Sequence, residues 1–146
     1  MECIFCKIVR GEVSAFKVYE NESVLAFLDI NPRSYGHTLV IPKKHYETLD
    51  LLPDEETAML FAAVKNVAAM LLKKLGACGF NLVVNNGKAA GQVIPHVHVH
   101  IIPRYGTESV AIESAFPVLA EVKDKLSEVH KKIIGEEDDC NYPCSQ

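Results

Sequence analysis

The sequence lacks two features that mark common functional classes, a long apolar run and an excess of positive charge. No stretch approaches the ~18 consecutive apolar residues of a membrane-spanning helix. The net charge of -4 argues against a nucleic-acid binder with a broad basic face. The first residues, MECIFCKIVRGE, also lack the order of a secretory signal. We therefore expect a cytoplasmic protein that binds neither membranes nor nucleic acid.

Cysteine is present, but not in a pattern that suggests structural disulfides. Five cysteines are spread unevenly over 146 residues, and disulfides are rare in the cytoplasm. The length suits a single core, and the 49% hydrophobic and 23% charged residues are ordinary for a globular protein. We predict one domain, residues 1–135, followed by an acidic tail, residues 136–146.

The predicted elements alternate between strands and helices. Apolar residues at spacings of three and four predict a helix from Pro53 to Leu75 and a second helix over residues 114–134. A short helical turn ends at Gly11. Segments rich in β-branched or aromatic residues and bounded by turn signals predict strands at residues 16–21, 23–30, 37–42, 79–87 and 96–103. This order indicates an α+β fold with a mostly antiparallel sheet.

Three histidines occupy alternate positions in the last of these strands. Side chains alternate between the faces of a strand, so His96, His98 and His100 are expected to share one face. The apolar residues between them would point into the core and fix the register, because a shift of one residue would bury imidazoles instead. These intervening residues are Val97, Val99 and Ile101.

This pattern has three interpretations, and geometry alone does not separate the last two. A solvent-facing stripe would more often use Thr, Lys or Glu. Three imidazoles can bind one metal ion with an open position for water. Imidazole is also suited to attack on phosphorus, because its reference pKa of ~6.5 leaves a neutral nitrogen at pH 7. The preceding loop favours phosphate chemistry, since glycines and amides supply donors there. These loop residues are Asn85, Gly87, Gly91 and Gln92.

The segment GQVIPHVHVHIIPR resembles the signature of the histidine triad (HIT) family of nucleotide-binding proteins. CIFCKIVRGE, VLAFLDINP, GHTLVIPKKH and VVNNG also appear in family order up to about Gly106. The closest resemblance is to the small dimeric branch of nucleoside phosphoramidases. It implies a HIT-like fold with a mostly antiparallel five-stranded sheet per subunit, one long helix and a C-terminal helix. The sheet is expected to continue across a homodimer.

The resemblance also implies a two-step hydrolysis at the α-phosphate of a purine nucleotide. His98 would be the nucleophile and form a nucleotidyl-histidine intermediate, His100 would orient the phosphate and leaving group, and His37 would support them. The substrates implied are nucleoside phosphoramidates or dinucleoside polyphosphates, with AMP as the bound product. A regulatory nucleotide-binding protein with little turnover is the alternative.

The same resemblance assigns the nucleotide-binding residues. Asp29 would accept hydrogen bonds from the ribose hydroxyls, as a carboxylate can. The base pocket would be walled by Phe5, Ile8, Phe27 and Ile30, and the phosphate would be bound by Asn85, Gly91, Gln92, His98 and His100.

Two departures from the family pattern bear on activity. Val93 stands where many relatives carry a hydroxyl residue that can reach the leaving group. The chain has no Trp, so the Trp-containing tail of some animal relatives has no counterpart. The related uridylyltransferases place Pro between two histidines, whereas Val97 and Val99 stand between them here, which favours hydrolysis over transfer.

Cys3 and Cys6 have the two-residue spacing of half a tetrahedral zinc site. A redox pair is the rival interpretation, but no strand leads into the motif. The family resemblance supplies His45 and His96 as the other two ligands of a structural zinc. Cys78 is interpreted as an incidental thiol, and no role is assigned to Cys140 and Cys144.

Overall fold

The computed structural model describes residues 2–106 and 116–135. The chain divides into two units, residues 1–108 and 109–146, and each is described by itself. The predicted acidic tail, residues 136–146, lies outside the described residues, so the boundary at residue 135 stays a prediction. Within the described ranges, no helix combines the length and the apolar character needed to cross a membrane.

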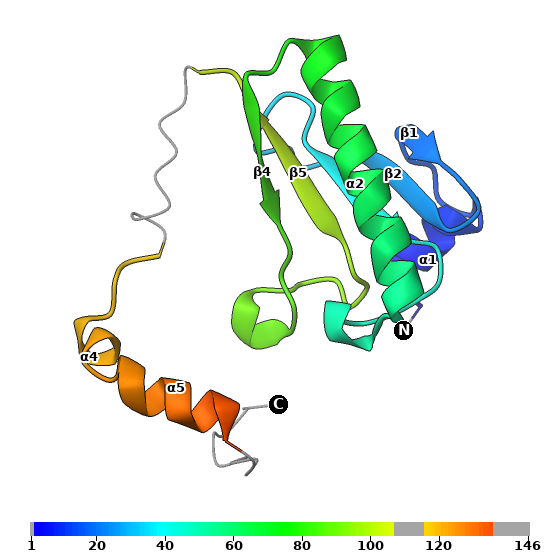
Figure 1. Cartoon of the computed structure of the whole chain (residues 1–146). Helices are drawn as coiled ribbons and strands as arrows, with labels where there is room; N and C mark the ends of the chain where they lie inside the picture. Colours follow the sequence, from blue (N-terminus) through cyan, green and yellow to red (C-terminus); the bar gives the residue numbers. More distant parts are fainter. Residues whose placement is uncertain (1, 107–115, 136–146) are drawn as a thin grey trace. The chain divides into compact units, whose positions relative to one another are not determined.

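The first unit is built on one five-stranded sheet in the order β1-β2-β3-β5-β4. Every neighbouring pair of strands is antiparallel, and α2 lies across the sheet (Figure 1). The predicted α+β architecture with one long helix is therefore confirmed. The elements are α1 Ile4–Val9, β1 Lys17–Glu20, β2 Val24–Leu28, β3 Thr38–Pro42, α2 Asp54–Leu75, β4 Gly79–Val83 and β5 Val99–Arg104, with 3-10 turns η1 Leu49–Leu51 and η2 Lys88–Ala90.

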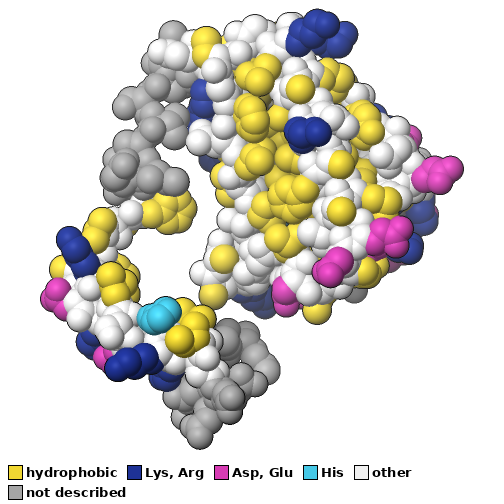
Figure 2. Space-filling view, viewed as in Figure 1, with side chains coloured by type: hydrophobic (Ala, Val, Ile, Leu, Met, Phe, Trp, Pro, Cys, Tyr) yellow, Lys and Arg dark blue, Asp and Glu magenta, His cyan; other side chains and the backbone are white. Residues whose placement is uncertain are grey.

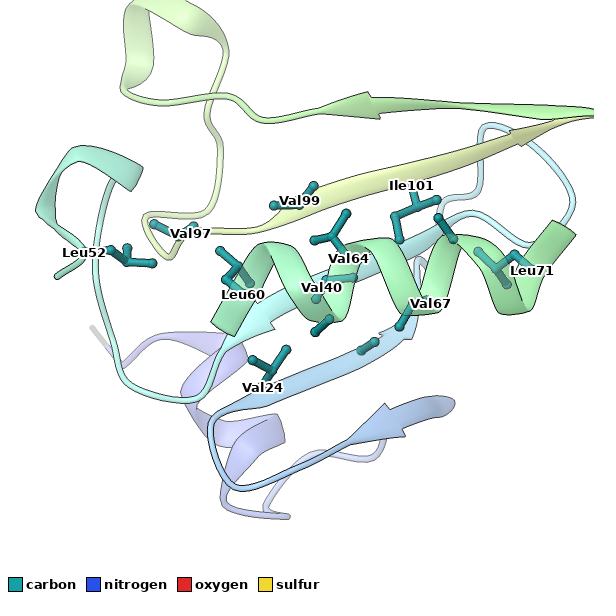
Figure 3. Packing of buried hydrophobic residues seen from close by; sticks show 13 residues of the cluster. Val24, Val40, Leu52, Leu60, Val64, Val67, Leu71, Val97, Val99 and Ile101 are labelled. Atoms are coloured by element: carbon teal, nitrogen blue, oxygen red, sulfur yellow. The ribbon is translucent and has the colours of Figure 1, made fainter. Parts of the chain in front are cut away.

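The long helix forms where the sequence predicts it. Pro53 precedes its first turn, three acidic residues follow, and Gly76 ends it in a left-handed conformation with φ 71°. Its apolar stripe packs on one face of β2, β3 and β5 and forms the main core (Figure 3). Val24 and Ala26 of β2 belong to this core.

The opposite face of the sheet packs on α1. Leu25 and Phe27 alternate with the residues that face α2, and they contact Phe5 and Ile8 of α1. The alternation of β2 thus divides the buried side chains between two layers. Because α1 carries Cys6 and these aromatic and aliphatic contacts, and Cys3 is its N-cap, its position determines the shape of this second face.

The fifth strand is shorter than predicted. It begins at Val99, whereas the prediction placed its start at His96. Val97 still lies in the α2-side core, and its N–H donates to the carbonyl of Tyr46 at 2.9 Å. The extended chain therefore keeps the expected alternation of side chains although His96 and His98 precede the regular ladder.

In the second unit the predicted single helix over 114–134 is wrong. Residues 114–115 are not described, and the helical part consists of α4 Ala120–Lys123 and α5 Leu126–Ile134. Pro117 disfavours a helical conformation at Phe116, which delays the start. Lys125, with φ -111° and ψ 15°, leaves helical geometry and separates the two helices.

Gly36 is required where the loop before β3 meets the end of α2. Its φ is 87°, and an added Cβ would clash with Cδ1 of Leu75. We expect Gly36→Ala to lower the free energy of unfolding by ~1–3 kcal/mol, mainly from backbone strain at positive φ, because the end of the Leu75 side chain can move aside. Gly79→Ala is the matched control, because no atom lies within 4 Å of its added Cβ. Equal losses for both variants in urea unfolding would contradict this account.

Candidate functional site

A cavity of about 590 Å³ opens on the α1 face of the sheet. Among the residues that line it are most of those assigned from the sequence. These are Phe5, Ile8, Phe27, Asp29, Ile30, His37, Asn85, Gly91, His98 and His100.

Gln92 does not line this cavity. Its Oε1 accepts from the Gly87 N–H at 2.7 Å, and its Nε2 donates to the carbonyls of Glu47 at 2.7 Å and Ile94 at 3.0 Å. The side-chain amide is therefore engaged by backbone groups. In this geometry Gln92 shapes the loop around Gly91 and does not present its amide to a ligand.

His98 is held in one tautomer by the backbone. Its Nδ1 lies 2.7 Å from the carbonyl oxygen of His96, which can only accept, so Nδ1 carries the proton. The Nε2 atom therefore keeps its lone pair. The ring of Phe5 contacts His98 edge-on with centroids 5.2 Å apart. A buried imidazole with a free ring nitrogen thus borders the cavity.

His37 and His100 form a directed hydrogen-bond chain. The Arg33 N–H donates to Nδ1 of His37 at 2.9 Å, so His37 carries its proton on Nε2. That Nε2–H donates to Nδ1 of His100, also at 2.9 Å. His100 must then carry its own proton on Nε2, which makes it a hydrogen-bond donor.

Asp29 lies beside this pair and also shapes its own turn. Its Oδ1 accepts from the Asn31 N–H at 2.8 Å. Its Oδ2 is 3.6 Å from Nε2 of His37 and 4.0 Å from Nδ1 of His100. The carboxylate is therefore close enough to both imidazoles to favour their protonated forms.

Burial nevertheless keeps both imidazoles neutral. Burial, followed by the proximity of His98 and His37, lowers the pKa of His100 to about 4. Burial also lowers the pKa of His37, and the Asp29 charge only partly opposes this effect. Both rings are therefore neutral at pH 7, as the hydrogen-bond chain requires.

This lowered pKa predicts a loss of stability in acid. The unfolded chain, with an imidazole pKa of ~6.5, binds more protons than the folded chain between that pH and about 4. The contribution of neutral His100 to the free energy of unfolding is therefore complete above pH ~6.5. It is lost on acidification, by up to ~3 kcal/mol. Urea titrations of His100→Gln should show a flatter pH dependence. His130→Gln, on exposed α5, should keep the wild-type slope, and an unchanged slope in His100→Gln would contradict the assignment.

A second cluster lies beside the first, where α1 meets the end of β3. Cys3, Cys6, His45 and His96 place their ligand atoms within 4.8 Å of one another. Nδ1 of His96 is 3.3 Å from Sγ of Cys3 and 3.2 Å from Nδ1 of His45. Two thiols and two imidazoles are a set that zinc prefers.

The tautomer of His96 suits metal binding. Its Nε2 lies 2.8 Å from the carbonyl of Pro42, so Nε2 carries the proton and Nδ1 is free to act as a ligand. Such a hydrogen bond from the second ring nitrogen is usual for metal-bound histidine.

The three histidines of the motif therefore do not converge on one ion. Among the described residues, His96 belongs to the cysteine cluster, and His100 belongs to a group with Asp29 and His37. His98 is in neither group. In that second group a hydrogen bond already joins the two imidazoles. The interpretation of His96, His98 and His100 as a shared metal site is not supported by this arrangement.

Arg33 was missed by the sequence interpretation. Its backbone N–H fixes the tautomer of His37, and the residue lines the cavity. The available signal was its position within NPRSYGH, between Asp29 and His37. Backbone donors leave no signature in side-chain patterns, so this contact could only come from the structure.

Comparison with known proteins places these features in a family. A family model described as the HIT domain matches residues 10–107. An uncharacterized HIT-like protein of Methanocaldococcus jannaschii is 54% identical over 134 residues, which are 91% of this chain and 99% of that protein. Adenosine 5'-monophosphoramidase HNT1 of Candida albicans is 37% identical over 135 residues, which are 90% of this chain and 88% of that protein.

Solved structures show the same fold. A HIT family member from Bacillus subtilis has a TM-score of 0.75 at 40% identity, covering 94% of this chain and all of that chain (100%). A zinc-bound histidine triad family protein from Mycobacterium smegmatis has a TM-score of 0.72 at 36% identity, covering 88% of this chain and 98% of that chain. Together with the ordered motifs around the three histidines, these matches show that the chain belongs to the histidine triad family.

Proposed function

We propose that the protein is a nucleotide hydrolase that cleaves at the α-phosphate through a covalent intermediate on His98. The observation that carries this proposal is the 2.7 Å hydrogen bond between Nδ1 of His98 and the carbonyl of His96. It leaves the lone pair of Nε2 available at the cavity, which is what a nucleophile on phosphorus needs. The similarity to an adenosine 5'-monophosphoramidase supports the same chemistry.

The cavity suggests how a purine nucleotide would lie. Phe5 and Phe27 meet edge-on with ring centroids 5.5 Å apart, and together with Ile8 they offer an apolar wall for a base. Ile30 is 84% exposed, so it would close only the rim. Asp29 would accept from the ribose hydroxyls.

The α-phosphate would then meet the polar side of the cavity. His98, His100, Asn85 and the backbone of Gly91 line that side. Amide and imidazole donors there would stabilise the charge that develops on the phosphate oxygens. Gln92 would act indirectly, by holding the loop through its three backbone contacts.

The reaction would proceed in two displacements at phosphorus. Nε2 of His98 forms a P–N bond while the bond from phosphorus to the leaving group breaks and its electron pair departs with that group. An amine leaving group takes its proton from solvent water, because a neutral His100 cannot give up its Nε2–H without becoming an anion. That N–H, whose tautomer His37 keeps in place, instead donates a hydrogen bond to the phosphate. Water then attacks phosphorus and releases a proton to solvent, while the P–N bond breaks and its electron pair returns to Nε2 of His98.

A low-turnover nucleotide-binding protein is the alternative, and Val93 favours it. The side chain of Val93 is 90% exposed at the cavity and offers no donor for a leaving group. The two functions are separated by incubation with an adenosine phosphoramidate, a quench in base and intact-mass measurement. A nucleotidyl adduct supports the hydrolase. AMP binding with neither adduct nor turnover supports the binding protein.

We also propose that Cys3, Cys6, His45 and His96 hold a structural zinc ion. The donor set and the free Nδ1 of His96 fit this metal. The zinc-bound relative from Mycobacterium smegmatis supports the choice. When bound, zinc would join α1 to His45, which follows β3, and to His96, which precedes β5. A cytoplasmic location, also proposed, would keep the thiols reduced.

A homodimer is expected through α2 and the edge strand β4. Phe80 is 40% and Leu82 46% exposed on β4, and both occupy the α2 face of the sheet, since Leu82 is paired with Ile101. Hydrophobic side chains gather over α2 and the neighbouring strands (Figure 2). We expect a dimer by light scattering at micromolar concentration and a monomer for Leu82→Lys. A wild-type monomer would refute this expectation.

A further inference from the structure

The cavity extends past the triad on the side away from the base wall. The strand register places Phe27 beside Leu39, Leu39 beside His100, and His100 beside Val83. These four residues form a row across β2, β3, β5 and β4, and neighbouring strands lie ~4.8 Å apart. A nucleoside against Phe27 and Leu39 therefore leaves room for a leaving group beyond His100.

The β4 and β5 part of the cavity is mostly apolar. Val83, Val93 and Ile102 line the cavity with apolar atoms, and Asn85 adds one side-chain amide. Among the described residues that line the cavity, Arg33 is the one with a permanent positive charge. A leaving group with oxygen atoms would therefore find its strongest side-chain donor in Arg33.

Arg33 is held close to the reacting groups by its backbone. Its N–H donates to His37 at 2.9 Å, and His37 donates to His100 at 2.9 Å. Its guanidinium has no ion-pair partner in the described part of the chain. The positive charge of Arg33 also contributes, after burial, to the lowered pKa of both His37 and His100.

We propose that Arg33 is a specificity residue that selects substrates whose leaving group is an oxyanion, phosphate or sulfate, over those with a neutral amine. This inference rests on the proposed hydrolysis at the α-phosphate. When the P–O bond breaks, its electron pair stays on the departing oxygen, whose negative charge the guanidinium offsets without a proton transfer. An amine must instead take a proton from solvent water and gains nothing from Arg33.

Binding measurements test this assignment without turnover. By calorimetry, wild-type protein should bind ADP more tightly than AMP, because the β-phosphate occupies the leaving-group side. Arg33→Gln should lose ~5–20-fold in ADP affinity and less than about two-fold in AMP affinity, the range of a charge-assisted contact. Arg33→Lys should restore part of the difference. Lys65→Gln, which removes a charge from the exposed side of α2, should change neither value.

Kinetics provide the second readout. Arg33→Gln should lower kcat/KM by ~10–100-fold for adenosine 5'-phosphosulfate and a dinucleoside polyphosphate, but by less than about three-fold for the phosphoramidate. A fall for only one of the two anionic substrates would assign the site to sulfate or to phosphate. Equal falls for all substrates, or unchanged ADP affinity, would overturn the assignment. Wild-type protein that binds neither AMP nor ADP would overturn the proposed function as well, whereas AMP binding without an ADP advantage would overturn only the role of Arg33.

Discussion

Replacement of His98 by alanine is expected to abolish the nucleotidyl adduct and to lower kcat/KM for an adenosine phosphoramidate by ~10⁴-fold or more. The variant keeps the apolar wall, Asp29 and His100, so AMP should still bind with nearly unchanged affinity. The loss should fall on kcat, because the missing Nε2 acts only when the bond to phosphorus forms. Steady-state kinetics and calorimetry on the same preparation separate the two effects.

Two other histidine variants serve as comparisons for the His98→Ala loss of activity. His130→Ala removes an imidazole from exposed α5 and should leave kinetics unchanged. His37→Ala removes the donor to Nδ1 of His100 and should reduce turnover by ~10–100-fold while the adduct still forms. If His98→Ala retains turnover within ten-fold of wild type, His98 is not the nucleophile.

Side-chain alternation along the strand lets the sequence predict which way the histidines point, but nothing more about the site. Val97 and Ile101 fix which way the intervening histidines point, and both lie in the core as the pattern requires. The pattern cannot assign protons, because the tautomers depend on backbone groups distant in sequence. His96 donates to Pro42, and His37 accepts from the Arg33 N–H. The contact of His96 with Pro42 distinguishes this candidate metal ligand from the candidate nucleophile His98 two residues away.

The error in the C-terminal helix has an equally local cause. Apolar spacing over 114–134 predicted one helix, but periodicity does not weigh the restriction that Pro117 imposes on Phe116. The assignment of Gln92 to the phosphate stays a prediction, but its side-chain donors and acceptor are engaged by Gly87, Glu47 and Ile94. A polar side chain in a loop near a site can stabilise the loop or bind a ligand, and its hydrogen-bond partners distinguish the two roles.

The candidate metal cluster and the cavity meet at α1. Cys3 and Cys6 flank Phe5, whose ring contacts His96 at a centroid distance of 5.7 Å and His98 at 5.2 Å. The helix that supplies half of the candidate metal site therefore also supplies the base wall. Its six residues, Ile4–Val9, are too few to be stable alone, so its position depends on what it packs against and binds.

Loss of the metal is therefore expected to affect both stability and nucleotide affinity. Wild-type protein should contain one zinc per chain by mass spectrometry. Removal by a chelator, or Cys6→Ser, should lower Tm by ~10 °C, much less than small zinc-dependent peptides lose because a core remains. AMP affinity should fall by ~3–10-fold, since Phe5 and Ile8 lose their fixed position while Asp29 and the triad remain.

Cys78→Ser is the matched control for this loss. Cys78 is exposed and lies outside the metal cluster, so zinc content, Tm and AMP affinity should stay at wild-type values. Some turnover should survive chelation, because His98 attacks phosphorus without a metal ligand. Complete and immediate loss of turnover that added zinc restores would instead indicate a metal-bound hydroxide as the nucleophile. A chelated protein with unchanged Tm and AMP affinity would show that α1 is held by packing alone.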